Sequence, residues 1–154
     1  INRFISMLTE NSLSSKQSIA VQKLTKITDE LEYIADYIDK LASYSTRYQQ
    51  EDDLAEGKEQ LMQFFISVKE FYHDITLNLP QRSSLEGDMI KARAQRLKIT
   101  AESIREDHLA VPDHLQRGSE HFMTYSDMVV CLRKIRGHAL KIYHATSQND
   151  HLSH

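Results

Sequence analysis

The sequence predicts an all-α fold, an antiparallel helical bundle of long helices, and three observations support this prediction. Apolar residues recur three or four positions apart over four long stretches, which is the spacing of a helix that buries one face. Short polar breaks separate these stretches. The chain has only four glycines and two prolines in 154 residues, which is too few for the turns of an all-β fold.

The first long helix is predicted to begin near Ser14 and to reach about Tyr48 without an intervening glycine or proline. Ser14 and Gln17 have the spacing of a capping box, in which the two side chains accept hydrogen bonds from the first backbone N–H groups. The expected buried stripe consists of Leu24, Ile27, Leu31, Ile34, Ile38 and Leu41. Four tyrosines are expected on a flank between core and solvent, as packing residues rather than a stacking platform: Tyr33, Tyr37, Tyr44 and Tyr48.

The second helix is predicted after a polar break at residues 49–53, where Asp53 is a candidate cap, and it ends before Pro80. Its expected stripe is Leu54, Leu61, Phe64, Phe65, Val68, Phe71, Tyr72, Ile75 and Leu79. The third helix is predicted to start at another capping-box spacing, Ser83 and Glu86. Its expected stripe is Ile90, Ala94, Leu97, Ala101 and Ile104.

The last helix is predicted from about Ser119 to Thr146, after a break that contains Pro112 and Gly118. Its expected stripe is Phe122, Tyr125, Val129, Leu132, Ile135, Ala139 and Ile142. His108 continues the stripe of the preceding helix, so we expect a packed, hydrogen-bonded histidine there. The basic residues on the other faces of that preceding helix are expected to form a solvated surface: Lys91, Arg93, Arg96, Lys98 and Arg105.

Net charge, cysteine content and the distribution of apolar residues limit the classes of protein to which this chain can belong. A net charge of −3 gives no reason to expect nucleic acid as a partner. The lone Cys131 allows no internal disulfide and fits a reducing compartment. No run of about 18 apolar residues is present, so no membrane-spanning segment is predicted in this sequence. We expect one domain over residues 1–154, with residues 1–12 as the remnant of an incomplete first helix and residues 147–154 as a flexible tail.

A second, acidic stripe runs along the first long helix. Its members are also three or four residues apart and lie nearly opposite the apolar stripe: Asp29, Glu32, Asp36 and Asp39. Glu32 and Asp36, at i and i+4, are close enough to share a divalent or iron-type metal ion, to which Asp29 and Asp39 would add ligands. The alternative is a solvated acidic face that meets a partner or a basic helix. The sequence favours this alternative, because two carboxylates alone make a weak metal site.

Two segments echo each other at an offset of 101 residues, within 31–41 and 132–142. The matched pairs are Leu31 and Leu132, Ile34 and Ile135, Lys40 and Lys141, and Leu41 and Ile142. Two helices of similar register suggest a duplicated helical unit, although a shared helical rhythm alone produces part of this likeness.

With these motifs the chain resembles the PhoU family of phosphate-uptake regulators. It looks most like the PhoU-type cytoplasmic domain at the C-terminus of bacterial sodium/phosphate cotransporters. The segment AspGluLeuGluTyrIleAlaAsp matches the family's Leu-Glu-Arg-Ile-Gly-Asp-type motif and places its metal-binding pair at Glu32 and Asp36. The second copy keeps the hydrophobic frame and His138, with Arg133 and Gly137 in place of the two carboxylates, and this departure favours the cotransporter branch. The resemblance covers about residues 14–146 and implies about one and a half three-helix repeats.

The resemblance implies a non-enzymatic regulatory domain of a sodium-dependent phosphate transport protein, which acts through weak metal binding or partner binding. The implied cofactor is a divalent or iron-type metal ion, or none. The implied partners are the membrane transporter portion of the same protein and a second copy of the chain in a homodimer, without nucleic acid. The implied location is the cytoplasmic face of the bacterial inner membrane.

Two other interpretations stay open. The segment HisAlaLeuLys at 138–141 matches the core of histidine phosphotransfer domains, with His138 as the phosphoacceptor and Lys141 beside the phosphate. Those domains usually have a glycine where this chain has Ile142. The other interpretation is a helical adaptor with no ligand.

Overall fold

The computed structural model describes residues 13–48, 55–77, 84–110 and 119–147. Within these ranges the chain forms four α-helices and no strand: α2 (Ser15–Tyr48), α3 (Ala55–Leu77), α4 (Ser84–Leu109) and α5 (Ser119–Ser147). The predicted all-α helical bundle is therefore confirmed. The helix remnant predicted at 1–12 lies outside the described residues, as do residues 148–154 of the predicted tail. Ser147, which is predicted as part of that tail, is instead the last residue of α5.

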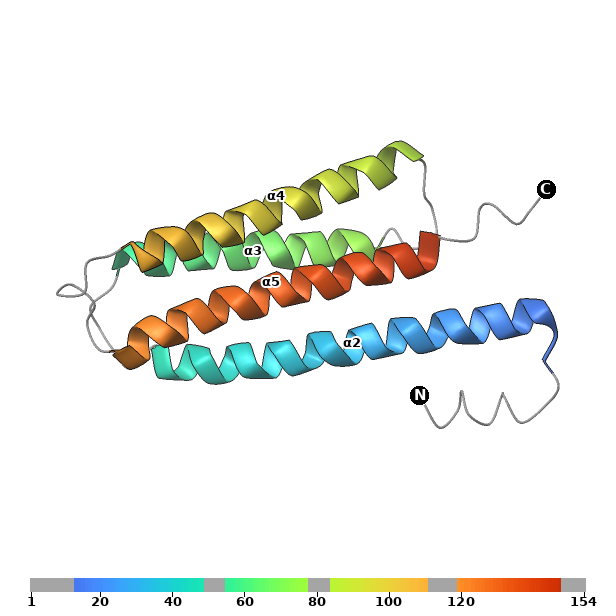
Figure 1. The fold of residues 1–154 in the computed structure, drawn as a ribbon, viewed down its shortest axis with the longest axis horizontal. Coiled ribbons are helices and arrows are strands. Elements are labelled where there is room, and N and C mark those ends of the chain that lie inside the picture. Colours follow the sequence, from blue (N-terminus) through green and yellow to red (C-terminus); the bar gives the residue numbers. More distant parts are fainter. Residues whose placement is uncertain (1–12, 49–54, 78–83, 111–118, 148–154) are drawn as a thin grey trace.

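Helix α5 is central to the arrangement. It packs against each of the three other described helices, and α3 also packs against α4. Helix α2 differs, because among the described helices only α5 runs close to its backbone. Figure 1 shows α2 along one side of α5, with α3 and α4 on the other. The described part of the chain thus consists of a three-helix unit, α3–α4–α5, to which α2 is attached through α5.

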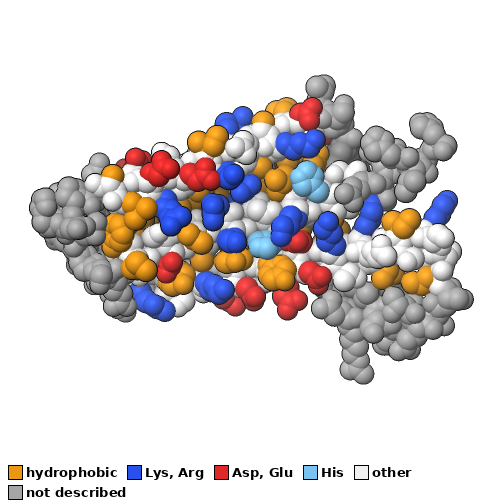
Figure 2. Space-filling model, viewed as in Figure 1, with side chains coloured by type: hydrophobic (Ala, Val, Ile, Leu, Met, Phe, Trp, Pro, Cys, Tyr) orange, Lys and Arg blue, Asp and Glu red, His pale blue; other side chains and the backbone are white. Residues whose placement is uncertain are grey.

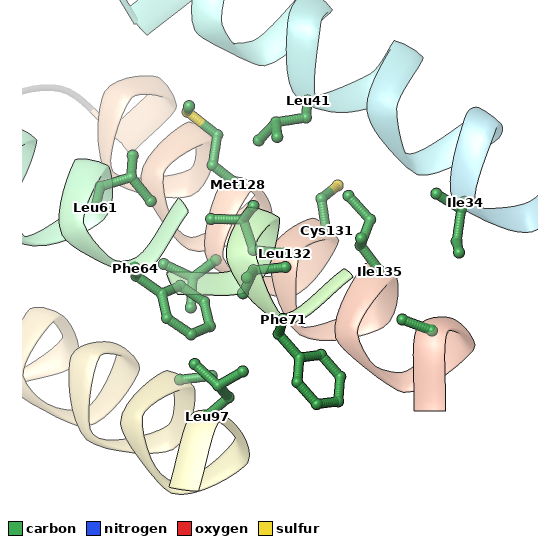
Figure 3. Packing of buried hydrophobic residues seen from close by; sticks show 14 of the residues in the cluster. Ile34, Leu41, Leu61, Phe64, Phe71, Leu97, Met128, Cys131, Leu132 and Ile135 are labelled. Carbon is green, nitrogen blue, oxygen red and sulfur yellow. The ribbon is translucent and has the colours of Figure 1, made fainter. Parts of the chain in front are cut away.

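The core is deepest within the three-helix unit. The largest fully buried side chains all belong to α3 and α5: Val68, Phe71, Ile75, Val129, Leu132 and Ile142. Helix α2 adds apolar side chains to this core from one face, among them Ile34 and Leu41. Figure 3 shows Leu41 of α2 and Leu61 of α3 approaching Met128 of α5 from different helices. One continuous apolar cluster therefore links α2 to the three-helix unit.

The helix limits follow the local signals in the sequence. The Ser14 N–H donates to Gln17 Oε1 at 2.9 Å, and the Gln17 N–H donates to Ser14 Oγ at 3.4 Å. These two hydrogen bonds confirm the capping box predicted before α2. The other predicted caps, Asp53 and Ser83, lie outside the described residues.

The predicted buried stripe of α2 is partly wrong. Ile34 and Leu41 are buried, but Leu24, Leu31 and Ile38 are 52%, 39% and 51% exposed. The three exposed residues are seven apart and therefore share one flank of the helix. Because α2 has a single neighbouring helix among those described, a stripe wide enough for two neighbours is covered on one side only.

Two aromatic positions also differ from the prediction. Phe65, expected in the core, is 40% exposed, and Tyr48, expected on a flank, is 5% exposed. His108 confirms its prediction, because its ring stacks on Phe122 and on Tyr125 with centroid separations of 4.1 and 4.2 Å. Its Nε2 also lies 3.1 Å from the carbonyl oxygen of Phe122.

A polar link joins α3 to α4. Arg93 of α4 pairs with Asp74 of α3 and with Glu70 of α3 at 3.2 Å. The Arg93 side chain is 30% exposed, so this member of the predicted solvated basic surface belongs to the packing of the three-helix unit. Lys91, by contrast, is exposed as predicted.

Candidate functional site at the α2–α5 seam

The face of α2 that packs on α5, which we call the seam, follows a seven-residue repeat. Its apolar positions are Ile27, Ile34, Tyr37, Leu41, Tyr44 and Tyr48. The same row also contains Glu30, which is 7% exposed. A carboxylate thus occupies an otherwise apolar seam, where it is costly unless it is paired. Its partners therefore define a candidate site.

Two residues of α5 contact the Glu30 carboxylate. Glu30 Oε2 lies 2.5 Å from His138 Nδ1 and 3.4 Å from Lys141 Nζ. The Glu30 and His138 side chains are 10% and 12% exposed, whereas Lys141 is 53% exposed and reaches the pair from solvent. When Nδ1 carries a proton, in the neutral tautomer or in the imidazolium, it donates to the Glu30 carboxylate.

Two tyrosines of α2 stack on the His138 ring. The centroids of Tyr33 and Tyr37 lie 5.0 and 5.6 Å from it, with interplanar angles of 27° and 29°. Tyr33 is half exposed and lies on a flank as predicted, whereas Tyr37 is partly buried and belongs to the seam. We call Glu30, Tyr33, Tyr37, His138 and Lys141 the seam cluster.

The predicted metal ligands lie on another face of α2. The side chains of Asp29, Glu32, Asp36 and Asp39 are all exposed, and Figure 2 shows acidic side chains along the edge of the molecule over α2. The described residues contain no group of three or more His, Cys, Asp or Glu side chains that could hold a metal ion. Glu32 and Asp36 thus have no third protein ligand within the described ranges. The metal site stays a prediction that depends on two exposed carboxylates.

The predicted phosphoacceptor, His138, lies inside the seam cluster. A phosphoacceptor must meet the reactive group of a partner protein, and this ring is 12% exposed, with its Nδ1 against Glu30. Lys141, predicted beside the phosphate, pairs with Glu30. This geometry gives the phosphotransfer interpretation no support.

The second motif copy presents a basic group, Arg133, where the first presents the Glu32 carboxylate. Arg136 lies near Arg133, and burial lowers the pKa of its guanidinium, with a further decrease from the charge of Arg133 and an opposing effect of Glu102. The Arg136 Nε is buried and has no hydrogen-bond partner among the described residues. Figure 2 shows basic side chains along the middle of this face of the molecule, where Figure 1 places α5. A Cβ added at Gly137 would meet no atom within 4 Å.

A second feature lies on the other flank of α2. A groove of about 480 Å³ runs between α2 and α3, with α5 beneath it. Its apolar lining includes Ile38 and Ala42 of α2, Met62 and Phe65 of α3, and Met128 and Leu132 of α5. We call this the α2–α3 groove. It exists because α2 and α3 both pack on α5 and not on each other.

Comparison of the chain with protein-family models, with curated proteins and with solved structures gave no match. None of the described helices combines the length and the apolar character that crossing a membrane requires. The resemblance to the PhoU family therefore stays a prediction from the sequence motifs.

Sequence reasoning missed Glu30 and found His138 only through a motif match. The signal for Glu30 was present, because it lies three residues after Ile27 and four before Ile34, on the row that becomes the seam. The predicted stripe includes Leu31, one residue further on, and leaves Glu30 out. Leu31 is apolar and Glu30 is charged, so the sequence favours Leu31 as the buried residue. Which of the two is buried depends on the position of α5.

Proposed function

We propose that this chain is a non-enzymatic, PhoU-like regulatory domain of a sodium-dependent phosphate transport protein, at the cytoplasmic face of the bacterial inner membrane. The observation that carries the proposal is the pairing of α2 with α5. These helices bear the two motif copies on which the resemblance depends. Glu30, beside the first motif, pairs with His138 and Lys141 of the second.

The attachment of α2 through one helix suggests how such a domain would respond to a signal. A ligand or partner that binds one position of α2 relative to the three-helix unit shifts the population toward that position. Sliding α2 by one turn, about 5.4 Å, would separate Glu30 from His138 and leave a shielded carboxylate without its main partner. The seam cluster therefore favours discrete positions over continuous sliding.

Uptake of radiolabelled phosphate tests the proposal in cells that express the full-length protein. Deletion of residues 15–147 is expected to leave sodium-dependent transport in place and to remove its response to the phosphate supply. His138→Ala is expected to change that response in part, because it removes the link between the two motif helices. Uptake that responds identically in all three strains would contradict the proposal.

A calorimetric titration separates the two modes of regulation that the resemblance implies. The metal-stripped domain is titrated with manganese, zinc and iron, with Glu32→Gln/Asp36→Asn as the control variant. Saturable binding that the double variant loses would add a metal ion to the mechanism. Equal behaviour of the two proteins would leave partner binding as the mode of regulation.

A further inference from the structure

The α2–α3 groove lies where a further helix of the bundle would pack. Helices α2 and α3 both lie on α5, yet their backbones are not close to each other in the described part of the chain. In a helical bundle, neighbouring helices pack with their axes about 8–10 Å apart and bury a shared core. A helix placed over α5 in this groove would give α2 and α3 the neighbour that each lacks on this side.

The walls of the groove are large apolar side chains that lie open. Ile38 is 51% exposed, Met62 is 56% exposed and Phe65 is 40% exposed. Beneath them, Met128 and Leu132 of α5 form a buried apolar floor. Apolar side chains of this size, gathered on one concave surface, are typical of a binding surface rather than of scattered surface residues.

The apolar surface continues beyond the groove along α2. Leu24 and Leu31 precede Ile38 at intervals of seven residues, on the same flank of the helix, and Ala42 lies one turn further on. The distance from Leu24 to Ala42 along the axis is about 27 Å at 1.5 Å per residue. A helix of about 18 residues would match this length.

The charges differ between the two sides of the groove: Lys58 lines the wall formed by α3, whereas the flank of α2 outside the lining is acidic. The α2 side therefore indicates which charge a helix bound in the groove would carry there. Glu32 and Asp39 each follow an exposed apolar residue, Leu31 or Ile38, and so lie about 100° further around α2. Both are exposed, and within the described residues no lysine or arginine pairs with them or with Asp36. Basic side chains beside this rim would pair with these carboxylates and relieve their mutual repulsion.

We propose that the α2–α3 groove binds an amphipathic α-helix of a partner protein, and that this helix carries basic residues on the flank beside α2. Its apolar residues, three and four apart, occupy the groove between Ile38 and Phe65, and its basic flank pairs with the acidic rim. The groove and its acidic rim include no residue of the seam cluster and do not involve the contact between Glu30 and His138. The proposed role in phosphate uptake and this docking site can therefore fail separately.

The probe for this proposal is a fluorescent peptide of about 18 residues, with leucines three and four apart and lysines on one flank. Fluorescence anisotropy measures its affinity for the 154-residue chain. Saturable binding is expected, and Met62→Glu is expected to weaken it by about tenfold or more, because it places a charge in the apolar wall. Ile99→Glu on α4 is the matched control, because Ile99 is 55% exposed and lies outside the groove lining.

Charge reversal tests the basic flank. Asp39→Lys is expected to weaken binding of the lysine peptide and to strengthen binding of the same peptide with glutamates in place of the lysines. Circular dichroism and thermal unfolding show whether each variant keeps the wild-type fold. If the wild-type chain binds the lysine peptide and the glutamate peptide with equal affinity, the bound helix does not need a basic flank and that part of the proposal is overturned.

Other occupants give different results, and each would overturn the proposal. A dimer in sedimentation experiments that Met62→Glu dissociates would assign the groove to a second copy of the chain. Peptide binding by a chain that starts at Leu13, but not by the 154-residue chain, would assign it to residues 1–12. Absence of saturable binding, or an equal loss in Ile99→Glu, would mean that the groove is not a docking site.

Discussion

Helix α2 and the α3–α4–α5 unit are both built from amphipathic helices, yet they are held in different ways. In the three-helix unit each helix packs on both others, and side chains such as Ile75 and Ala139 have no exposed surface. Of the described helices, α2 packs on α5 alone, and half of its predicted apolar stripe is exposed. The number of neighbouring helices, and not the apolar pattern itself, therefore determines how much of an amphipathic helix is buried.

Truncation of one core side chain in each region is expected to change the free energy of unfolding most. Phe71→Ala in α3 is expected to cost about 3–5 kcal/mol of unfolding free energy, because the side chain is 1% exposed and its removal leaves a closed cavity. Leu41→Ala in α2 is expected to cost about 2 kcal/mol, the lower end for this substitution, because Leu41 borders an open groove. Urea unfolding followed by circular dichroism measures both values. A Leu41→Ala cost equal to that of Phe71→Ala would contradict the distinction between the two regions.

The next effect concerns the contact of Glu30 in α2 with His138 and Lys141 in α5. His138→Ala leaves the Glu30 carboxylate shielded with Lys141 as its remaining partner, so we expect a cost of about 2–3 kcal/mol. Asp36→Ala, on the exposed face of the same helix, is expected to change stability by less than about 0.5 kcal/mol.

Hydrogen exchange shows where the His138→Ala loss falls. Amides of α2 are expected to exchange faster, while those of α3 and α4 keep the protection that they have in the wild-type protein. Equal acceleration in all four helices would show that α2 does not open separately and that the described chain unfolds as one unit.

The same contrast explains what the sequence alone could predict. The four helices and the capping box at Ser14 follow from local spacing, and the structure confirms them. The choice between Glu30 and Leu31 depends on where α5 lies, which is a tertiary property that periodicity does not contain. The α2–α3 groove was equally hidden, because Phe65 and Ile38 have the same apolar character as buried neighbours in the sequence.

Tyr125 of α5 is expected to make the free energy of unfolding depend on pH. It lies at one end of the bundle, where it contacts both α2 and α3. Its hydroxyl donates to Gln60 Oε1 of α3 at 3.3 Å, and its ring centroid lies 6.1 Å from that of Tyr48 of α2. Burial raises the pKa of Tyr125 to about 12, with smaller contributions from Tyr48 and Asp107. The unfolded chain has a tyrosine pKa of about 10. The stabilisation is therefore fully present below pH 10 and is lost as the pH rises from 10 to 12.

The expected loss of unfolding free energy between these two pH values is about 1–2 kcal/mol, because water penetration reduces the full effect of the shift. Tyr125→Phe removes the ionisable group and is expected to flatten this part of the stability profile. Urea unfolding at intervals from pH 9 to 12 compares the two proteins. Parallel profiles would mean that Tyr125 ionises as readily in the folded protein as in the unfolded chain.

The last prediction compares Gly137 on α5, beside the seam cluster, with Gly87 on α4, which faces α5. A Cβ at Gly137 meets no atom within 4 Å, so Gly137→Ala is expected to stabilise α5 by about 0.5–1 kcal/mol through its better helix propensity. A Cβ at Gly87 would lie 2.7 Å from Tyr143 Oη, so Gly87→Ala must displace that ring and loses the same gain. Thermal unfolding of both variants measures the difference. If the two substitutions stabilise the protein equally, the Tyr143 side chain moves aside at little cost, and the close contact at Gly87 does not limit substitution there.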